Sequence, residues 1–138
     1  MMDDCIFCKI IKKEISSYQV YEDDRYFAFL DINPLNLGHT MIIPKEHVRW
    51  VWDVADFGGY FEIAKKINRG LETALKPEWV ALAVAGLGVP HAHIHVVPRF
   101  PNNGHGEYLD SKNIKKIPEG EMKIIVDKIK KAIEQKGE

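Results

Sequence analysis

The chain has 138 residues, of which 46% are hydrophobic, and a formal net charge of −1. This balance supplies no basic field for nucleic acid, and no apolar run is long enough to span a membrane. The length predicts a single domain over residues 1–138, with its core over about residues 3–100 and a loop and helix over residues 101–138. The first residues are acidic and lack the regions of a signal peptide, which predicts a cytoplasmic location.

The N-terminal part of the chain predicts a short helix followed by strands. Residues 5–14 place apolar side chains at helical spacing, and the predicted helix carries Cys5 and Cys8 on its first turns. Aromatic and β-branched residues then alternate in short runs that are separated by acidic or Asn-Pro turns. Three strands are predicted here, the first two as a hairpin: residues 18–22, 25–31 and 39–44.

A long amphipathic helix is predicted next. Asp53 or Asp56 caps its start, and its apolar stripe continues to about Leu75. Residues 79–84 form a nearly continuous apolar run of strand length, which predicts a buried central strand. Glycines at positions 86 and 88 then turn the chain into the last strand.

The C-terminal part is polar at first and then amphipathic. Residues 100–119 contain glycine, asparagine and proline, so we expect a loop in which His105 is solvated. Residues 121–135 predict a helix with one apolar side. Five strands, a long helix, a short N-terminal helix and a C-terminal helix together predict an α+β fold built on a five-stranded antiparallel sheet.

The last predicted strand contains three histidines at alternate positions, His91, His93 and His95, between Pro90 and Pro98. Side chains on a strand point alternately to opposite faces, so the three rings are expected to share one face. Imidazole has an unperturbed pKa close to neutrality. Such a row is suited to metal binding, to nucleophilic or acid–base chemistry, or to both.

The two cysteines form a Cys-x-x-Cys pair, which in a reducing compartment indicates a metal or redox site more often than a disulfide. Zinc takes four such ligands, and two histidines could complete the set. Spacing alone does not identify them, but His47 and His91 lie at the ends of predicted strands and are the best placed to meet the N-terminal helix. We therefore predict one structural Zn²⁺ site of Cys5, Cys8, His47 and His91. The alternative is a reduced pair without metal.

If zinc takes His91, the histidines at positions 93, 95 and 39 remain for chemistry. Imidazole is a competent nucleophile toward phosphorus, and neighbouring rings can donate hydrogen bonds to phosphate oxygens. Glycines in the Gly86-Leu87-Gly88 turn would let backbone N–H groups approach the same phosphate.

The run from His91 to Val97 resembles the His-φ-His-φ-His-φ-φ signature of the histidine triad superfamily of nucleotide hydrolases and transferases, where φ is an apolar residue. The resemblance covers roughly residues 3–100 and is greatest to the branch of histidine triad nucleotide-binding proteins. Further matching segments are Cys5-Ile-Phe-Cys-Lys-Ile, Tyr21-Glu-Asp-Asp-Arg25, Phe29-Leu-Asp-Ile-Asn-Pro34 and Gly38-His-Thr-Met-Ile-Ile-Pro-Lys-Glu-His47.

The resemblance implies a hydrolase that cleaves at the α-phosphate of a nucleoside phosphoramidate or dinucleoside polyphosphate. It implies that His93 is the nucleophile, that a nucleotidyl-histidine forms on its ring, and that His95 and His39 line the phosphate site. It also implies the same zinc set, a purine nucleotide substrate and a homodimer whose sheets join edge to edge. Asp31 would hold the ribose, and the remaining nucleotide-binding residues would be Phe7, Ile10, Phe29, Leu30, Ile32, Gly88 and Val89.

This sequence departs from the family pattern near the leaving group. Many members have glutamine and Ser or Thr where this chain has Leu87 and Gly88, and residues 80–84 lack an asparagine that contacts phosphate. Each missing transition-state donor can lower the rate by ~10²–10³-fold. These departures leave open a nucleotide-binding module with little activity. A nucleotidyltransferase, whose acceptor site would lie in the loop over residues 101–117, and a hydrolytic metal site on the three alternating histidines also stay open.

Overall fold

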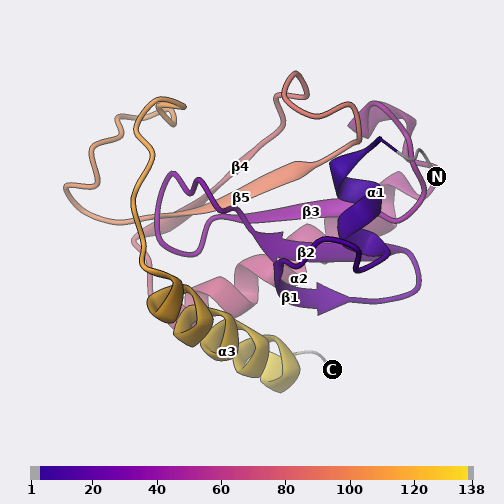
Figure 1. Cartoon of the computed structure of the whole chain (residues 1–138). Helices are drawn as coiled ribbons and strands as arrows, with labels where there is room; N and C mark the ends of the chain where they lie inside the picture. Colours follow the sequence, from indigo (N-terminus) through magenta and orange to yellow (C-terminus); the bar gives the residue numbers. More distant parts are fainter. Residues whose placement is uncertain (1–3, 137–138) are drawn as a thin grey trace.

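The computed structural model describes residues 4–136, so the ends of the predicted domain, residues 1–3 and 137–138, lie outside the described residues. The described elements, in chain order, are α1 (Ile6–Ile11), β1 (Tyr18–Glu22), β2 (Tyr26–Leu30), β3 (Thr40–Pro44), the 3₁₀ turn η1 (Val51–Asp53), α2 (Phe57–Leu75), β4 (Trp79–Ala83), β5 (Ile94–Arg99) and α3 (Glu119–Lys136). The strands form one antiparallel sheet in the order β1-β2-β3-β5-β4 (Figure 1), which confirms the predicted α+β fold. No helix among the described residues is long and apolar enough to cross a membrane.

Side-chain caps set the starts of two helices. The Cys5 sulfur accepts a hydrogen bond from the Cys8 N–H at 3.4 Å, and α1 begins directly after Cys5. Asp56 caps α2 by accepting from the Gly59 N–H at 3.2 Å, so of the two predicted caps Asp56 is the correct one. The first cap places the thiol groups at the start of α1, where they can meet ligands from the sheet.

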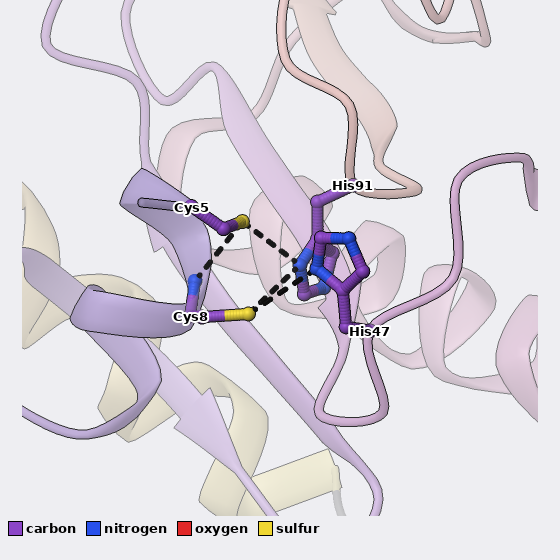
Figure 2. Close-up of side chains that lie close together, drawn as sticks. All are labelled: Cys5, Cys8, His47 and His91. Atoms are coloured by element: carbon purple, nitrogen blue, oxygen red, sulfur yellow. Dashed lines mark hydrogen bonds between the residues drawn. The ribbon is translucent and has the colours of Figure 1, made fainter. Parts of the chain in front are cut away.

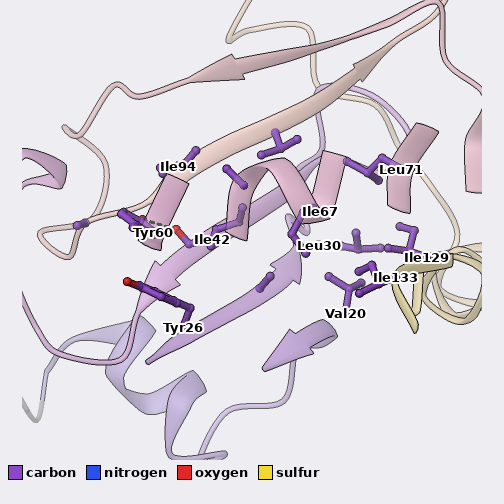
Figure 3. Close-up of a cluster of buried hydrophobic side chains, with 14 of the residues drawn as sticks. Val20, Tyr26, Leu30, Ile42, Tyr60, Ile67, Leu71, Ile94, Ile129 and Ile133 are labelled. Atoms are coloured by element: carbon purple, nitrogen blue, oxygen red, sulfur yellow. Dashed lines mark hydrogen bonds between the residues drawn. The ribbon is translucent and has the colours of Figure 1, made fainter. Parts of the chain in front are cut away.

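Alternation along the strands divides the buried side chains between two faces of the sheet. On β2, Ala28 and Leu30 point to the face covered by α2 and α3, whereas Phe27 and Phe29 point to the face covered by α1 (Figure 1). The larger cluster, between the sheet and the two long helices, is shown in Figure 3. Within it the Tyr60 hydroxyl donates to the Ile42 carbonyl at 2.5 Å, so this buried polar group is satisfied.

The close packing of α3 on α2 depends on Gly70. A Cβ at this position would lie 2.6 Å from Cγ1 of Ile133 on α3, whereas a Cβ at Gly58 of the same helix would meet nothing within 4 Å. We expect Gly70→Ala to lower the free energy of unfolding by about 1–3 kcal/mol through overpacking. Gly58→Ala is expected to raise it by up to about 1 kcal/mol through helix propensity. Urea unfolding of both variants measures this difference, and equal effects would contradict the packing account.

The predicted central position of residues 79–84 is wrong. The strand exists, as β4, but among the described strands it pairs only with β5 and forms an edge of the sheet. Trp79 and Leu82 on it are 45% and 55% exposed. An apolar run shows that both faces of a strand are apolar, but its place in a sheet depends on long-range pairing that local pattern does not encode.

The predicted strand over residues 91–98 begins later than expected. In the structure β5 starts at Ile94, because the N–H groups of the preceding residues bond outside the sheet. The His91 N–H donates to the Val89 carbonyl at 2.8 Å and the Ala92 N–H to the Val48 carbonyl at 2.7 Å. His91 and His93 therefore lie in an irregular segment, yet both contact the ring of Phe7 and so share a face as predicted.

Candidate functional site

Two cysteines at the start of α1, Cys5 as its N-cap and Cys8 within it, form one compact group with two histidines from the sheet side (Figure 2). His47 follows β3 and His91 precedes β5, so residues far apart in sequence meet here. Nδ1 of His91 lies 3.4 Å from Sγ of Cys5 and 3.6 Å from Sγ of Cys8, and Nδ1 of His47 lies 3.3 Å from the Cys8 sulfur. The structure thus brings together all four predicted ligands, whose ligand atoms lie within 4.8 Å of one another.

The donor set and its spacing fit a tetrahedral zinc ion. With Zn–S near 2.3 Å and Zn–N near 2.0 Å, a tetrahedron separates sulfur from nitrogen by about 3.5 Å, close to the observed distances. The ring nitrogen of His91 that faces away from the thiols, Nε2, donates to the Pro44 carbonyl at 2.8 Å. The ring proton is therefore on Nε2, and the lone pair of Nδ1 faces the thiols. Such a second bond orients a metal-ligating imidazole. These four residues could therefore hold a metal ion in a closed site.

The ring of His93 is held apart from this group by a backbone bond. Its Nδ1 donates to the His91 carbonyl at 2.8 Å, because a carbonyl oxygen can only accept. In the neutral ring the proton is therefore on Nδ1, and Nε2 carries the free lone pair. The edge of the His93 ring packs on Phe7, with the ring centroids 5.3 Å apart. This tautomer is the one required of a nucleophile that attacks through Nε2.

His39 and His95 form a hydrogen-bonded pair beside His93. The Leu35 N–H donates to Nδ1 of His39 at 3.0 Å, so the proton of the neutral His39 ring is on Nε2. That nitrogen lies 2.9 Å from Nδ1 of His95 and donates to it, which leaves the His95 proton on Nε2. The ring centroids of His93 and His95 lie 5.1 Å apart. The pair thus presents an N–H donor next to the proposed nucleophile.

Burial keeps both rings of this pair neutral. Desolvation, followed by the neighbouring rings of His95 and His105, lowers the pKa of His39 to about 3. Desolvation and the ring of His93 lower the pKa of His95 to about 4. Desolvation also raises the pKa of the Asp31 carboxyl, whose Oδ2 lies 3.7 Å from Nε2 of His39. At neutral pH the two histidines therefore act as neutral hydrogen-bonding groups.

The proximity of Asp31, His39 and His95 does not make a second cation site. Their ligand atoms lie within 4.8 Å of one another, but Nε2 of His39 carries the ring proton because Nδ1 accepts from the Leu35 N–H. A metal at Nε2 would require removal of that proton, and would break the bond to His95. The geometry favours a polar chain over a metal site.

The depressed pKa of His39 predicts a pH-dependent stability. The unfolded chain binds a proton at this ring below about pH 6.5, whereas the folded protein does not, so stability falls as the pH drops below that value. Between pH 7.5 and 5.5 the stability advantage of the wild type over His39→Asn is expected to shrink by about 1.4 kcal/mol. Urea unfolding of both proteins at the two pH values measures this change. If the difference in free energy of unfolding between the wild type and His39→Asn does not vary with pH, the conclusion that His39 is buried as a neutral ring is wrong.

The predicted base-pocket residues divide between the two faces. Phe7, Ile10 and Phe29 lie together in the cluster under α1, and Ile32 is 73% exposed just beyond β2. Leu30 is a correction: its side chain lies in the core under α2, on the opposite face, because it follows Phe29 on a strand. Gly88 and Val89 line a cavity of about 450 Å³ next to Cys5 and His47.

Two residues near the site were not identified from the sequence. Arg49 donates to the Gly86 carbonyl at 2.6 Å and so holds the turn before the triad, and its guanidinium lies 3.9 Å from the Trp50 ring centroid. Both Arg49 and Trp50 line a cavity of about 280 Å³ that reaches His93.

His105 was expected to be solvated, but both of its ring nitrogens are hydrogen bonded and the ring is half-buried. A lone arginine or loop histidine has no local pattern that marks such contacts.

Comparison with known proteins defines the family. The HIT domain family model matches residues 12–102, and this chain belongs to that family. It is similar to an uncharacterized HIT-like protein of Borreliella burgdorferi, 46% identical over 114 residues and covering 76% of this chain and 82% of that one. It is also similar to an adenosine 5'-monophosphoramidase of Saccharomyces cerevisiae, 38% identical over 100 residues that cover 69% of this chain and 62% of that one.

The fold agrees with solved members of the family. A zinc-bound histidine triad family protein of Mycobacterium smegmatis superposes with a TM-score of 0.82 and 26% sequence identity, covering 97% of this chain and 96% of that one. The predicted resemblance to the histidine triad superfamily is thereby confirmed for both the sequence family and the fold.

Proposed function

We propose that this protein is a hydrolase that cleaves a nucleoside phosphoramidate or dinucleoside polyphosphate at the α-phosphate, through a nucleotidyl group on His93. The observation that carries the proposal is the pair of fixed tautomers: Nε2 of His93 has a free lone pair, and the adjacent His95 offers an N–H. The similar yeast protein is named as an adenosine 5'-monophosphoramidase, which supports the phosphoramidate as the first substrate to test.

In the first step Nε2 of His93 forms a bond to phosphorus and the bond from phosphorus to the leaving nitrogen breaks. The ring becomes an imidazolium, and its Nδ1–H shares the positive charge with the His91 carbonyl. His95 donates a hydrogen bond to a phosphate oxygen as charge develops. His95 keeps its proton. The hydrogen bonds that lead from its Nδ1 through His39 end at the Leu35 backbone N–H, which cannot supply another proton. The departing amine takes a proton from solvent.

In the second step water attacks phosphorus and the bond to Nε2 of His93 breaks. One proton of the water returns to solvent, the ring recovers its neutral Nδ1–H tautomer, and the nucleoside monophosphate leaves. A phosphate or sugar phosphate in place of water would make the same protein a nucleotidyltransferase. We take water as the acceptor, and turnover with and without added phosphate distinguishes the two reactions.

The remaining roles follow the family resemblance. Asp31 would hold the ribose, and the side chains of Phe7, Ile10, Phe29 and Ile32 would contact a purine base. Zn²⁺ on Cys5, Cys8, His47 and His91 would be structural. It would hold α1 to the segment that carries His93, and would supply no chemistry to the reaction.

Turnover of adenosine phosphoramidate and of a dinucleoside polyphosphate tests this proposal. The expected product of the first is adenosine monophosphate, formed at the same rate with and without added phosphate. A rate that rises with phosphate, together with a phosphorylated product, would instead indicate the transferase. Binding of adenosine monophosphate without turnover of either substrate would indicate the binding module.

We also propose a homodimer joined through β4. This edge strand exposes Trp79 and Leu82, and Val84, which follows it, is 47% exposed. A second copy could continue the antiparallel sheet at this edge and cover the apolar side chains. Leu82→Lys is expected to shift the wild-type dimer to a monomer in sedimentation velocity, whereas Lys66→Glu on α2 is the charge-change control. A monomeric wild type would contradict the proposal.

A further inference from the structure

The polar loop between β5 and α3 is tied to the loop between β2 and β3. In Figure 1 the two loops lie side by side at one end of the sheet. The Lys115 N–H donates to the Pro34 carbonyl at 2.7 Å, and Nε2 of His105 lies 2.9 Å from the Leu35 carbonyl. The loop over residues 100–118 thus contacts two consecutive carbonyls of the segment that leads to His39.

Hydrogen bonds also assign the tautomer of His105. The Asp110 N–H donates to Nδ1 of His105 at 2.9 Å, so the proton of the neutral ring is on Nε2 and is donated to the Leu35 carbonyl. The N–H of the same Leu35 donates to Nδ1 of His39. Residue 35 is therefore held at its carbonyl by His105, and holds His39 through its N–H.

We propose that His105 is a positioning residue for the reaction, which acts through Leu35 on the tautomers of His39 and His95. This inference rests on the proposed function, since it assigns a catalytic use to the His95 N–H. The path runs from the His105 ring to the Leu35 backbone, then to the His39 ring and to Nδ1 of His95. The ring of His105 bonds to the Leu35 carbonyl and accepts from the Asp110 N–H, so we assign it an action through Leu35 and not on the reacting atoms.

The physical reason is that the neutral His39 ring has two tautomers. With the Leu35 N–H in place, Nδ1 must accept and Nε2 must donate to His95. If Leu35 shifts, the alternative His39 tautomer becomes accessible, and its Nε2 lone pair then faces Nδ1 of His95. To donate to that lone pair, His95 would adopt the tautomer with its proton on Nδ1, and the N–H donor at its Nε2 would be lost.

The loop has internal bonds that do not reach residue 35, and these supply a matched control. Nζ of Lys115 lies 2.8 Å from the Asn103 carbonyl and 3.1 Å from Oδ1 of Asn113. Lys115→Met removes these bonds but keeps the backbone N–H that donates to Pro34. If general order in the loop were sufficient, Lys115→Met and His105→Ala would have similar effects.

The test compares the wild type with His105→Ala, His105→Gln and Lys115→Met by ¹⁵N NMR of the histidine rings and by kcat. In His105→Ala we expect His39 and His95 to populate both tautomers and kcat to fall roughly tenfold, as for a small misplacement of a catalytic group. The side chain of glutamine can both donate to Leu35 and accept from Asp110, so His105→Gln is expected to restore both readouts. Lys115→Met is expected to match the wild type.

Wild-type tautomers in His105→Ala would overturn the proposal, as would a shift of equal size in Lys115→Met. The NMR readout needs no substrate, so a protein without hydrolase activity still tests the positioning of the rings. If the tautomers shift as expected while the wild type turns over no phosphoramidate, then the proposed function fails and the positioning of His39 by His105 holds. If His105→Ala does not fold, the same readouts on His105→Phe, which fills the space without hydrogen bonds, decide the question.

Discussion

Replacement of His93 with alanine is expected to lower kcat for adenosine phosphoramidate by about 10⁴-fold or more, as for the loss of other catalytic nucleophiles. The reason is that Nε2 of His93 has its lone pair fixed by the bond from Nδ1 to the His91 carbonyl. No other described ring beside it offers the same group, because the proton of His95 is on Nε2. Steady-state kinetics with purified protein measures the loss.

Two controls separate chemistry from folding in this prediction. His95→Asn removes a hydrogen-bond donor but not the nucleophile, so its kcat should fall by a smaller factor, about 10²–10³-fold. The melting temperature and zinc content of His93→Ala should stay close to those of the wild type, because the ring of His93 is not a metal ligand. A His93→Ala protein that keeps more than a few per cent of the activity would contradict the assigned nucleophile.

Loss of the metal site is expected to give the largest change in stability. Cys8 is fully buried, and Cys8→Ala is expected to release zinc and to lower the free energy of unfolding by about 4 kcal/mol or more. Its sulfur lies near both Nδ1 of His47 and Nδ1 of His91, so its removal takes away the link between α1 and the sheet. Elemental analysis of the purified protein and urea unfolding measure the two effects.

The same helix supplies the control for this prediction. Ile6 is 47% exposed and is not a ligand, so Ile6→Ala should keep one zinc ion per chain and change stability by less than about 1 kcal/mol. Chelation should destabilise the wild type and Ile6→Ala alike, and should have no further effect on Cys8→Ala. A metal-free wild type that is as stable as Cys8→Ala would leave only the reduced cysteine pair, without metal.

Local pattern was sufficient for most of the elements and for the grouping of Cys5, Cys8, His47 and His91. The apolar periodicity predicted α2 and its end near Leu75, whereas its start was left open between caps at Asp53 and Asp56 and the structure selects Asp56. The proximity of these four residues was predicted because zinc chemistry restricts the residue types, and because residues at strand ends can meet the start of a helix. Both inferences depend on short-range geometry or on donor chemistry, which sequence records directly.

The errors concern contacts between distant segments. The edge position of β4 depends on the order of strands in the sheet. The bond of Ala92 to Val48 before β5 and the bond of His105 to Leu35 each depend on a partner more than 30 residues away. Leu30 is different, because strand alternation places it opposite Phe29, and a stricter use of that rule would have removed it from the base pocket.

The most direct test of the account is denaturing mass spectrometry of the protein quenched during turnover of adenosine phosphoramidate. The account predicts an adenylyl group on the peptide that contains His93, present in the wild type and absent from His93→Ala. An unmodified wild type that turns over substrate, or the same adduct on the His93→Ala protein, would contradict it.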